Sequence, residues 1–301
     1  MFKHILVPLD GSHLAEIVLP VANYLGRVLG AQVTLVHIVE PAAAATVHGD
    51  QHLTSAPEAE RYLEQIATQW FAPEVAVKCH VHTDTARKAA RGILDHEDEL
   101  VPDLVLMCSH GRSHLRSLLF GRIAQKIVAQ GRTPVLVIPA RATAMKTPFA
   151  LHTILAPTDG QAEHEPGLAM AIELALATRA HMALVATVPT LETLTGTQAT
   201  SGRLLPAATR TVLDLAQETL RKYLAEKAAR AEHLGLKASV RLLRGDPASV
   251  IIDTAEDVDA DLIVLATHGK AGARAFWAHS AAATVLAKTT RPILLVPLTH
   301  G

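Results

Sequence analysis

The chain has 301 residues, about twice the usual length of a single domain, and this predicts two domains of roughly 150 residues each. Apolar residues make up 49% of the chain and charged residues 19%, a globular composition that excludes a disordered or fibrous protein. The formal net charge is −1 and only 3% of the residues are aromatic. Nucleic acid and anionic membranes are therefore not expected as partners.

Cysteine content and hydropathy indicate the compartment. Cys79 and Cys108 are the only cysteines, which excludes a disulfide framework and a cysteine-type zinc site. The first residues reach Pro8 and Asp10 before any long apolar region forms, and no apolar span of 18 residues occurs. We therefore expect a soluble, cytoplasmic protein.

In the first half of the chain, apolar runs of strand length alternate with helical patterns. The runs lie at residues 5–8, 32–39, 75–81, 104–108 and 135–138. Continuous apolar runs of this kind are typical of strands buried on both faces of a parallel sheet. Pro20 falls in the first helical stretch and is expected to kink it.

Helical spacing of apolar residues appears in both halves. In the first half it comprises Ala59, Tyr62, Leu63, Ile66, Ala67 and Trp70, and in the second half Val212, Leu215, Ala216, Thr219, Leu220 and Tyr223. The alternation of strands and helices predicts an open, doubly wound α/β domain with a five-stranded parallel sheet in each half.

The two halves repeat each other. Residues 4–11 return at 153–160, and residues 103–112 return at 261–270, with nine additional residues inserted in the second copy. A period of this length is too long for a solenoid and indicates a duplicated domain. We predict domains at 1–140 and 149–301, packed on each other as an intramolecular pseudo-dimer.

Ligands of open parallel sheets bind beyond the carboxyl ends of the strands, where two loops carry suitable chemistry. After the first strand come Asp10, which can accept hydrogen bonds from a ribose or a base amine or can only cap the turn, and Ser12, a candidate N-cap. After the fourth strand comes Gly111, and Gly121 opens the next helix. Glycines at a helix N-terminus let backbone N–H groups approach a phosphate.

These motifs make both halves resemble universal stress protein domains, and the whole chain resembles a tandem of two. Members of that family carry a strand ending in Val-Pro-x-Asp-x-Ser and a later loop, Gly-x-x-Gly followed after nine residues by Gly-Ser/Thr, that wraps the phosphates of ATP. The resemblance covers nearly all of the chain apart from the linker. It implies a Rossmann-like fold of the adenine nucleotide alpha hydrolase type and a role in stress adaptation.

The resemblance also implies nucleotide-binding positions in each copy. In copy one they are Pro8, Asp10, Ile38, Gly111, Gly121 and Arg122, and in copy two Pro157, Asp159, Thr187, Gly269 and Ser280. The pattern is incomplete: Cys108 and Ala266 replace the first motif glycine, and His279 replaces the last one in copy two. Arg122 replaces the final Ser/Thr in copy one, where it either pairs with a phosphate or fills the pocket.

Seventeen histidines raise the question of a metal site. His80 and His82 would share one face of a strand, and His48 and His52 one face of a helix if that segment were helical, but neither pair has a third ligand in sequence. No metal site is therefore predicted. No Walker loop, His-Glu-x-x-His or Gly-x-Ser-x-Gly motif occurs, so no catalytic residue is assigned and no enzyme is predicted.

The sequence therefore predicts a stress-response protein that senses or stores an adenine nucleotide (ATP, ADP or AMP, with or without Mg²⁺) without turning it over. Two alternatives remain open: a scaffold whose degenerate pockets bind partner proteins, and a slow ATP hydrolase. A homodimer is compatible with either. Copy one is favoured for a triphosphate, because Gly111 and Gly121 keep the family spacing and Arg122 adds a positive charge at a helix N-terminus.

Overall fold

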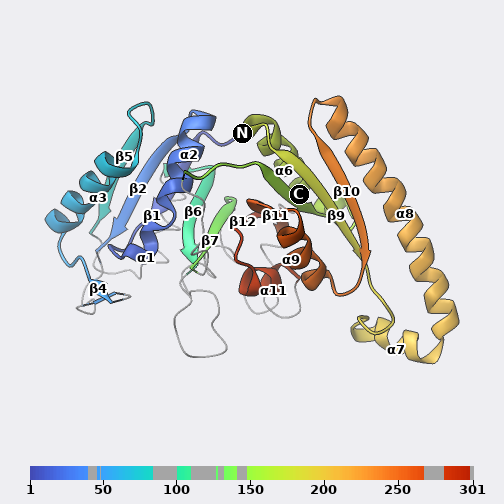
Figure 1. Ribbon diagram of the computed structural model, residues 1–301. Coiled ribbons are helices and arrows are strands. Elements are labelled where there is room, and N and C mark those ends of the chain that lie inside the picture. The colour runs from blue at the N-terminus through green and yellow to red at the C-terminus, as the bar shows by residue number, and fades with distance from the viewer. Residues whose placement is uncertain are drawn as a thin grey trace. The chain divides into compact units, whose positions relative to one another are not determined.

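The computed structural model describes residues 1–39, 46–47, 49–83, 100–109, 127, 132–140, 148–267 and 281–298. The chain divides into two compact units, each with α/β architecture (Figure 1). Unit 1 contains the described residues up to Ala150 together with residues 290–298. Unit 2 contains Leu151–Thr267 and residues 281–289.

Unit 1 is built on parallel strands in the order β7-β6-β1-β2-β5. Their bounds are β1 (His4–Pro8), β2 (Gln32–Ile38), β5 (Val77–His82), β6 (Leu104–Ser109) and β7 (Val135–Pro139). All five predicted strands are confirmed, with ends that agree within two residues. All of these strands except β5 are almost entirely buried, which explains their continuous apolar runs.

The last strand of the second sequence copy, β12 (Ile293–Pro297), also belongs to unit 1. It pairs antiparallel with β7, with Ile293 opposite Val137 and Leu295 opposite Val135. The α/β fold is confirmed, but the sheet is mixed rather than wholly parallel. Continuous apolar runs are typical of parallel strands, and the sequence pattern therefore predicted a parallel strand here. The run itself records only burial on both faces, and an antiparallel strand buried on both faces has the same pattern.

Among the described residues of unit 1, the helices that cover the sheet are α1 (His13–Glu16), α2 (Leu19–Leu29) and α3 (Ala56–Trp70). The predicted kink at Pro20 is instead an interruption between α1 and α2. Pro20 stands in the first turn of α2, where its missing N–H costs no helical hydrogen bond. Figure 1 shows α2 and α3 lying alongside the sheet strands β1, β2 and β5.

Unit 2 has four parallel strands in the order β10-β9-β8-β11. Their bounds are β8 (Thr153–Pro157), β9 (His181–Val188), β10 (Ala238–Arg244) and β11 (Leu262–Thr267). The helical segments are η1 (Ala162–His164), α6 (Glu165–Thr178), α7 (Gly196–Leu204), α8 (Pro206–His233), α9 (Pro247–Asp257) and α11 (Ala281–Lys288). None of the described helices is long and apolar enough to cross a membrane.

The long helix α8 corrects one expectation. Leu220 and Tyr223 are partly buried as predicted, but Val212 and Leu215 are 66% and 67% exposed, and Ala216 and Thr219 are exposed as well. The buried face instead follows Leu213, Leu224, Lys227 and Ala231. The first half of α8 is apolar over a wide arc, and only the side that packs on β9 and β10 is covered (Figure 1).

Equivalent aspartates close the amino edge of both sheets. The carboxylate of Asp103 accepts hydrogen bonds from the backbone N–H groups of Lys3 (2.7 Å) and His4 (2.9 Å). Asp261 does the same for His152 and Thr153, at 2.7 and 2.9 Å. Each aspartate ties its strand to the start of the neighbouring first strand, so the repeat noticed in the sequence at these positions has a structural cause.

Candidate functional site

The carboxyl edge of the unit 1 sheet brings three predicted positions together. Pro8 ends β1, Ile38 ends β2, and Asp10 lies in the loop that follows β1. Parallel pairing places Pro8 opposite Val36, so the two strand ends are neighbours. The spacing of apolar runs predicted the strand ends and the loop with Asp10, whereas Ile38 was implied by the family resemblance.

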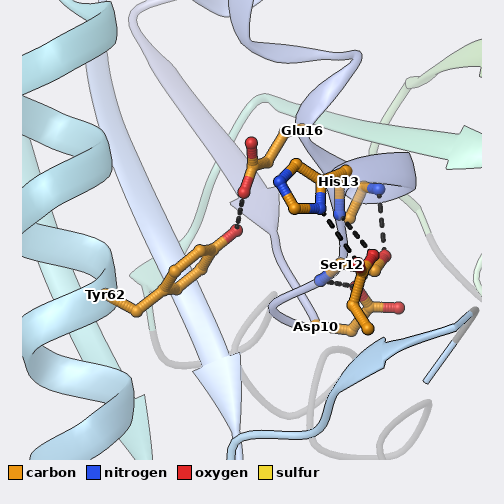
Figure 2. Close-up of polar contacts among 7 residues, drawn as sticks. Asp10, Ser12, His13, Glu16 and Tyr62 are labelled. Carbon is orange, nitrogen blue, oxygen red and sulfur yellow. Dashed lines mark hydrogen bonds and ion pairs between the residues drawn. The ribbon is translucent and has the colours of Figure 1, made fainter. Parts of the chain in front are cut away.

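Asp10 organises the loop after β1 (Figure 2). Its Oδ1 accepts hydrogen bonds from the Ser12 backbone N–H at 2.9 Å and from the Ser12 hydroxyl at 2.6 Å. Ser12 Oγ in turn accepts from the Ala15 backbone N–H at 3.2 Å, which confirms Ser12 as the N-cap of α1. The turn-capping role of Asp10 is therefore real.

His13 begins α1 and meets a carboxylate from a distant segment. The Asp50 Oδ2 accepts the His13 backbone N–H at 3.0 Å, and its Oδ1 lies 3.0 Å from His13 Nδ1. The hydrogen bond and the charge of Asp50 raise the pKa of His13, and the same hydrogen bonds lower the pKa of Asp50. No local sequence pattern indicates this contact, because its partners lie 37 positions apart.

Glu16, at the end of α1, accepts a hydrogen bond from the Tyr62 hydroxyl of α3 at 3.1 Å (Figure 2). Burial and the neighbouring Glu16 carboxylate raise the pKa of Tyr62 far above its ordinary value, so the phenol stays protonated and acts as a donor. The contact joins α1 to α3 beside the Asp10 loop. Helical spacing had assigned Tyr62 only to an apolar face.

A buried histidine of β2, His37, contacts the backbone of the same loop. The Leu9 backbone N–H donates to the Val36 carbonyl at 2.9 Å, and His37 Nδ1 lies 2.8 Å from the Leu9 carbonyl. Burial lowers the pKa of His37, so the neutral ring donates its Nδ1 proton to Leu9. The buried Nε2 finds no hydrogen-bond partner among the described residues. The sequence signal for this role of His37 was a single histidine inside a mostly apolar strand.

Cys108 occupies the position of the first motif glycine, near the end of β6, and is buried. Burial and the negative charge of Asp10 raise the pKa of the Cys108 thiol to about 12. The side chain is therefore a neutral thiol at physiological pH and an unsuitable nucleophile.

In unit 2 the carboxylate equivalent to Asp10 uses both of its oxygens. Asp159 Oδ1 accepts from the Gln161 backbone N–H at 3.0 Å, and Oδ2 pairs with His164 Nδ1 at 2.8 Å. Pro157 and Thr187 lie at the ends of β8 and β9 and are half-buried, at the edge where the sequence predicted them.

The glycine after each aspartate has a left-handed conformation, with φ of +87° at Gly11 and +78° at Gly160. A Cβ on Gly11 would lie 2.9 Å from the Leu53 side chain, and a Cβ on Gly160 would lie 2.8 Å from Leu220. Both positions therefore need glycine for the backbone angle and for the close approach of a leucine.

Gly245, Asp246 and Pro247 form the turn before α9, and residues 87–90 are the corresponding stretch of copy one. The Asp246 side chain accepts from the Ser249 backbone N–H at 2.9 Å and caps the helix, with Pro247 in its first turn. Gly245 donates its backbone N–H to the carbonyl of Val188 at the end of β9, at 3.1 Å. This turn therefore reaches the carboxyl edge of unit 2. Its copy-one counterpart lies outside the described residues.

The predicted phosphate-loop residues also lie outside the described part of the chain. They are Gly111, Gly121 and Arg122 in copy one and Gly269, His279 and Ser280 in copy two. The described geometry therefore concerns the loop after the first strand and the end of the second strand in each unit.

The histidine pairs do not form a metal centre in the described chain. Residues 46–47 and 50–51 pair as short antiparallel strands, so the segment around His52 is not the helix that a His48–His52 pair would need; His48 itself lies outside the described residues. His80 and His82 are two residues apart on β5 and so share one face of the strand, as expected. Among the described residues, no three His, Cys, Asp or Glu side chains gather in a group that could hold a metal ion.

Comparison with known protein families identifies the family to which the chain belongs. The model of the universal stress protein family matches residues 1–139 and matches again at residues 150–297. The chain belongs to the universal stress protein family. The two matches follow the sequence repeat, and they confirm the resemblance that the Pro-x-Asp and glycine motifs indicated.

Relatives of this universal stress protein match one copy or both. Universal stress protein YxiE of Bacillus subtilis is 26% identical over 147 residues, covering 46% of this chain and 99% of the relative. Universal stress protein MJ0531 of Methanocaldococcus jannaschii is 29% identical over 147 residues, covering 46% of this chain and 82% of the relative.

Two solved structures share the fold over nearly the whole chain. A universal stress protein from Archaeoglobus fulgidus has a TM-score of 0.69 at 14% identity and covers 98% of this chain and 96% of its own. PA1789 of Pseudomonas aeruginosa, a protein of unknown function, has a TM-score of 0.69 at 16% identity, with 99% and 93% covered. At this level of identity the likeness concerns the fold.

Proposed function

We propose that this universal stress protein binds an adenine nucleotide at the carboxyl edge of a sheet and senses or stores it without turning it over. The observation that carries the proposal is the meeting of Pro8, Asp10 and Ile38 at one edge of the unit 1 sheet. Open parallel sheets bind their ligands beyond that edge.

The described residues fit the ribose and base of such a ligand. Asp10 presents a carboxylate on a loop fixed by the Ser12 cap, and the end of β2 at Ile38 is buried and apolar. The phosphates would lie at Gly111, Gly121 and Arg122, where backbone N–H groups and a guanidinium supply positive potential. Stress adaptation and a cytoplasmic location belong to the same proposal.

The charge at this edge affects whether free ATP or Mg²⁺-bound ATP binds more tightly. The carboxylates of Asp10, Glu16 and Asp50 gather there, and His13 is the basic side chain paired with Asp50. A free triphosphate is repelled by such a group of carboxylates. We therefore expect ATP to bind more tightly in the presence of Mg²⁺, which neutralises phosphate charge.

Unit 2 supports the scaffold alternative. Both oxygens of Asp159 are already engaged, by Gln161 and by His164. The exposed Val212 and Leu215 of α8 give unit 2 an apolar surface of the kind that recruits proteins. On this view Pro157, Asp159, Thr187, Gly269 and Ser280 are remnants of a binding site rather than a working one.

Titration calorimetry of the full chain with ATP, ADP and AMP, each with and without Mg²⁺, separates a nucleotide binder from a scaffold. Mass spectrometry of small molecules released by denaturing the freshly purified protein would identify a ligand carried from the cell. Release of inorganic phosphate under excess ATP separates a binder from a slow hydrolase. Absence of binding by every nucleotide would refute the proposal and leave the scaffold.

A further inference from the structure

A short arm of unit 1 lies against the loop that carries Asp10. It comprises β3 (Thr46–Val47), β4 (Asp50–Gln51) and the two residues that follow, His52 and Leu53. The two strands pair antiparallel, with Thr46 opposite Gln51 and Val47 opposite Asp50. We refer to residues 46–47 and 49–53 as the strap.

Asp50 fastens one end of the strap to α1. Its carboxylate accepts the backbone N–H of His13 at 3.0 Å and lies 3.0 Å from the His13 ring nitrogen Nδ1. His13 is three residues beyond Asp10, and the charge of Asp10 also acts on Asp50. The strap therefore places an additional carboxylate beside the one proposed to contact the ribose.

Leu53 and His52 hold the other end. The Leu53 side chain lies so close to Gly11 that an added Cβ would come within 2.9 Å of it. The His52 ring packs edge-on against His37, with ring centres 6.5 Å apart, and His37 in turn contacts the Leu9 carbonyl. The strap thus contacts the loop directly after Asp10, at Gly11 and His13, and reaches Leu9 on the other side through His37.

In unit 2 a different element lies against the glycine of the corresponding loop. The side chain over Gly160 is Leu220, which belongs to the 28-residue helix α8. That helix is anchored by Lys227, whose Nζ lies 2.6 Å from Glu165 Oε1. A leucine on a long packed helix cannot move alone, whereas Leu53 belongs to a two-stranded arm.

We propose that the strap is an autoinhibitory cover of the unit 1 site, held shut by Asp50 on His13 and by Leu53 on Gly11, and displaced when a nucleotide binds. The inference rests on the proposed nucleotide binding in unit 1. The fastening is weak enough to open, because the His13 and Asp50 side chains are 85% and 30% exposed and exposed ion pairs contribute little in water. A closed strap lowers the apparent nucleotide affinity, because only the fraction of molecules with an open strap can bind.

The fastening depends on pH in a defined direction. The groups that face it are Asp50 from β4, Glu16 from α1 and Asp10 from the loop after β1. The pKa of His13 is raised, so its pairing is complete below the ordinary histidine value of about 6.5 and is lost as the pH rises through the raised value. The pKa of Asp50 is lowered, so its charge persists to mildly acidic pH. The strap is therefore shut most firmly below the ordinary histidine pKa and loosens as the pH rises through the raised pKa of His13.

The test compares the full-length wild type with Asp50→Asn, which keeps the shape and removes the charge. Glu74→Gln is the matched control, because it removes an exposed carboxylate of unit 1 that pairs with Arg27 instead, at 2.9 Å. Near pH 6, we expect Asp50→Asn to speed hydrogen exchange in residues 46–55 and to tighten MgATP binding about two- to fivefold. Glu74→Gln should change neither. Raising the pH from about 6 to 8 should tighten wild-type binding more than Asp50→Asn binding.

Each outcome decides the proposal. Unchanged exchange in Asp50→Asn would overturn the fastening. Faster exchange with unchanged MgATP affinity would overturn the covering role, and Leu53→Ser repeats that measurement at the other end of the strap. Binding by Asp50→Asn but not by the wild type would support the cover in its strongest form. If exchange rises and neither protein binds a nucleotide, the strap opens but guards no nucleotide site, and the proposed function fails with it.

Discussion

Tyr62 donates a hydrogen bond to Glu16 over 3.1 Å, and the equivalent Tyr223 lies 3.5 Å from Glu165 in unit 2. In each unit the tyrosine comes from the helix after the second strand and the glutamate from the helical segment after the first. The pair therefore joins two helices beside the carboxyl edge in both units. Lys227 adds a second partner for Glu165 in unit 2 alone.

Tyr62→Phe tests the strength of this connection. The substitution removes the donor to a carboxylate and keeps the buried ring, so we expect a loss of about 1–2 kcal/mol of unfolding free energy. Denaturant unfolding followed by circular dichroism measures it. Tyr223→Phe is the matched control and should cost less, because its contact is longer and Lys227 still pairs with Glu165. Equal losses in both variants would contradict this account.

Arg179 provides a second comparison between the units. It ends α6 in a left-handed conformation, φ +57°, and Gly30 ends α2 in the same way, φ +60°. A side chain in this region is strained and glycine is not. We expect Arg179→Gly to stabilise the protein by about 0.5–1 kcal/mol, and Gly30→Ala, which has open space around it, to destabilise it by about 1 kcal/mol. Thermal unfolding would show shifts of opposite sign, and a destabilised Arg179→Gly would refute the strain.

The sequence was sufficient to predict the five strands of the first half and the alternation of strands with helices, because buried parallel strands and duplicated motifs leave clear patterns. It failed where two arrangements have the same pattern. The run at 293–297 is equally apolar whether the strand is parallel or antiparallel, and it pairs antiparallel with β7. In α8, the exposed Val212 and the buried Leu213 are equally apolar, and only the position of the sheet decides between them.

The site was predictable in part. Pro8 and Asp10 were placed at the carboxyl edge because parallel strands end together, and Ile38 was implied by the family resemblance. The contacts that fix the edge were not predictable, since His13 with Asp50 and Tyr62 with Glu16 join residues 37 and 46 positions apart. Such pairs depend on how a loop or helix returns over the sheet, and no local spacing encodes that return.

The Glu165–Lys227 pair predicts acid sensitivity in unit 2. Its hydrogen bond and charge lower the pKa of Glu165, so its contribution is complete above the ordinary glutamate value of about 4.3 and is lost as the pH falls through the lowered value. Glu165 is 43% exposed, so solvent screening limits the effect to about 1 kcal/mol. Between about pH 5 and 3, the melting temperature of the wild type should fall more than that of Glu165→Gln, by about 1–3 °C. Parallel curves for the two proteins would refute the assignment.

The last prediction concerns which unit binds the nucleotide. The sequence favours copy one for a triphosphate, because Gly111 and Gly121 keep the spacing at which backbone N–H groups approach phosphates and Arg122 adds a fixed charge. Gly121→Val should then abolish most ATP affinity by steric exclusion, and Arg122→Ala should weaken binding by about 1.5–3 kcal/mol, as measured by calorimetry. Gly269→Val changes the retained motif glycine of copy two, the counterpart of Gly111; it is the control and should bind ATP as the wild type does. The opposite result, with Gly121→Val unaffected and Gly269→Val inactive, would assign the nucleotide to unit 2. There the engaged Asp159 carboxylate would have to release His164 before it could accept a ribose hydroxyl.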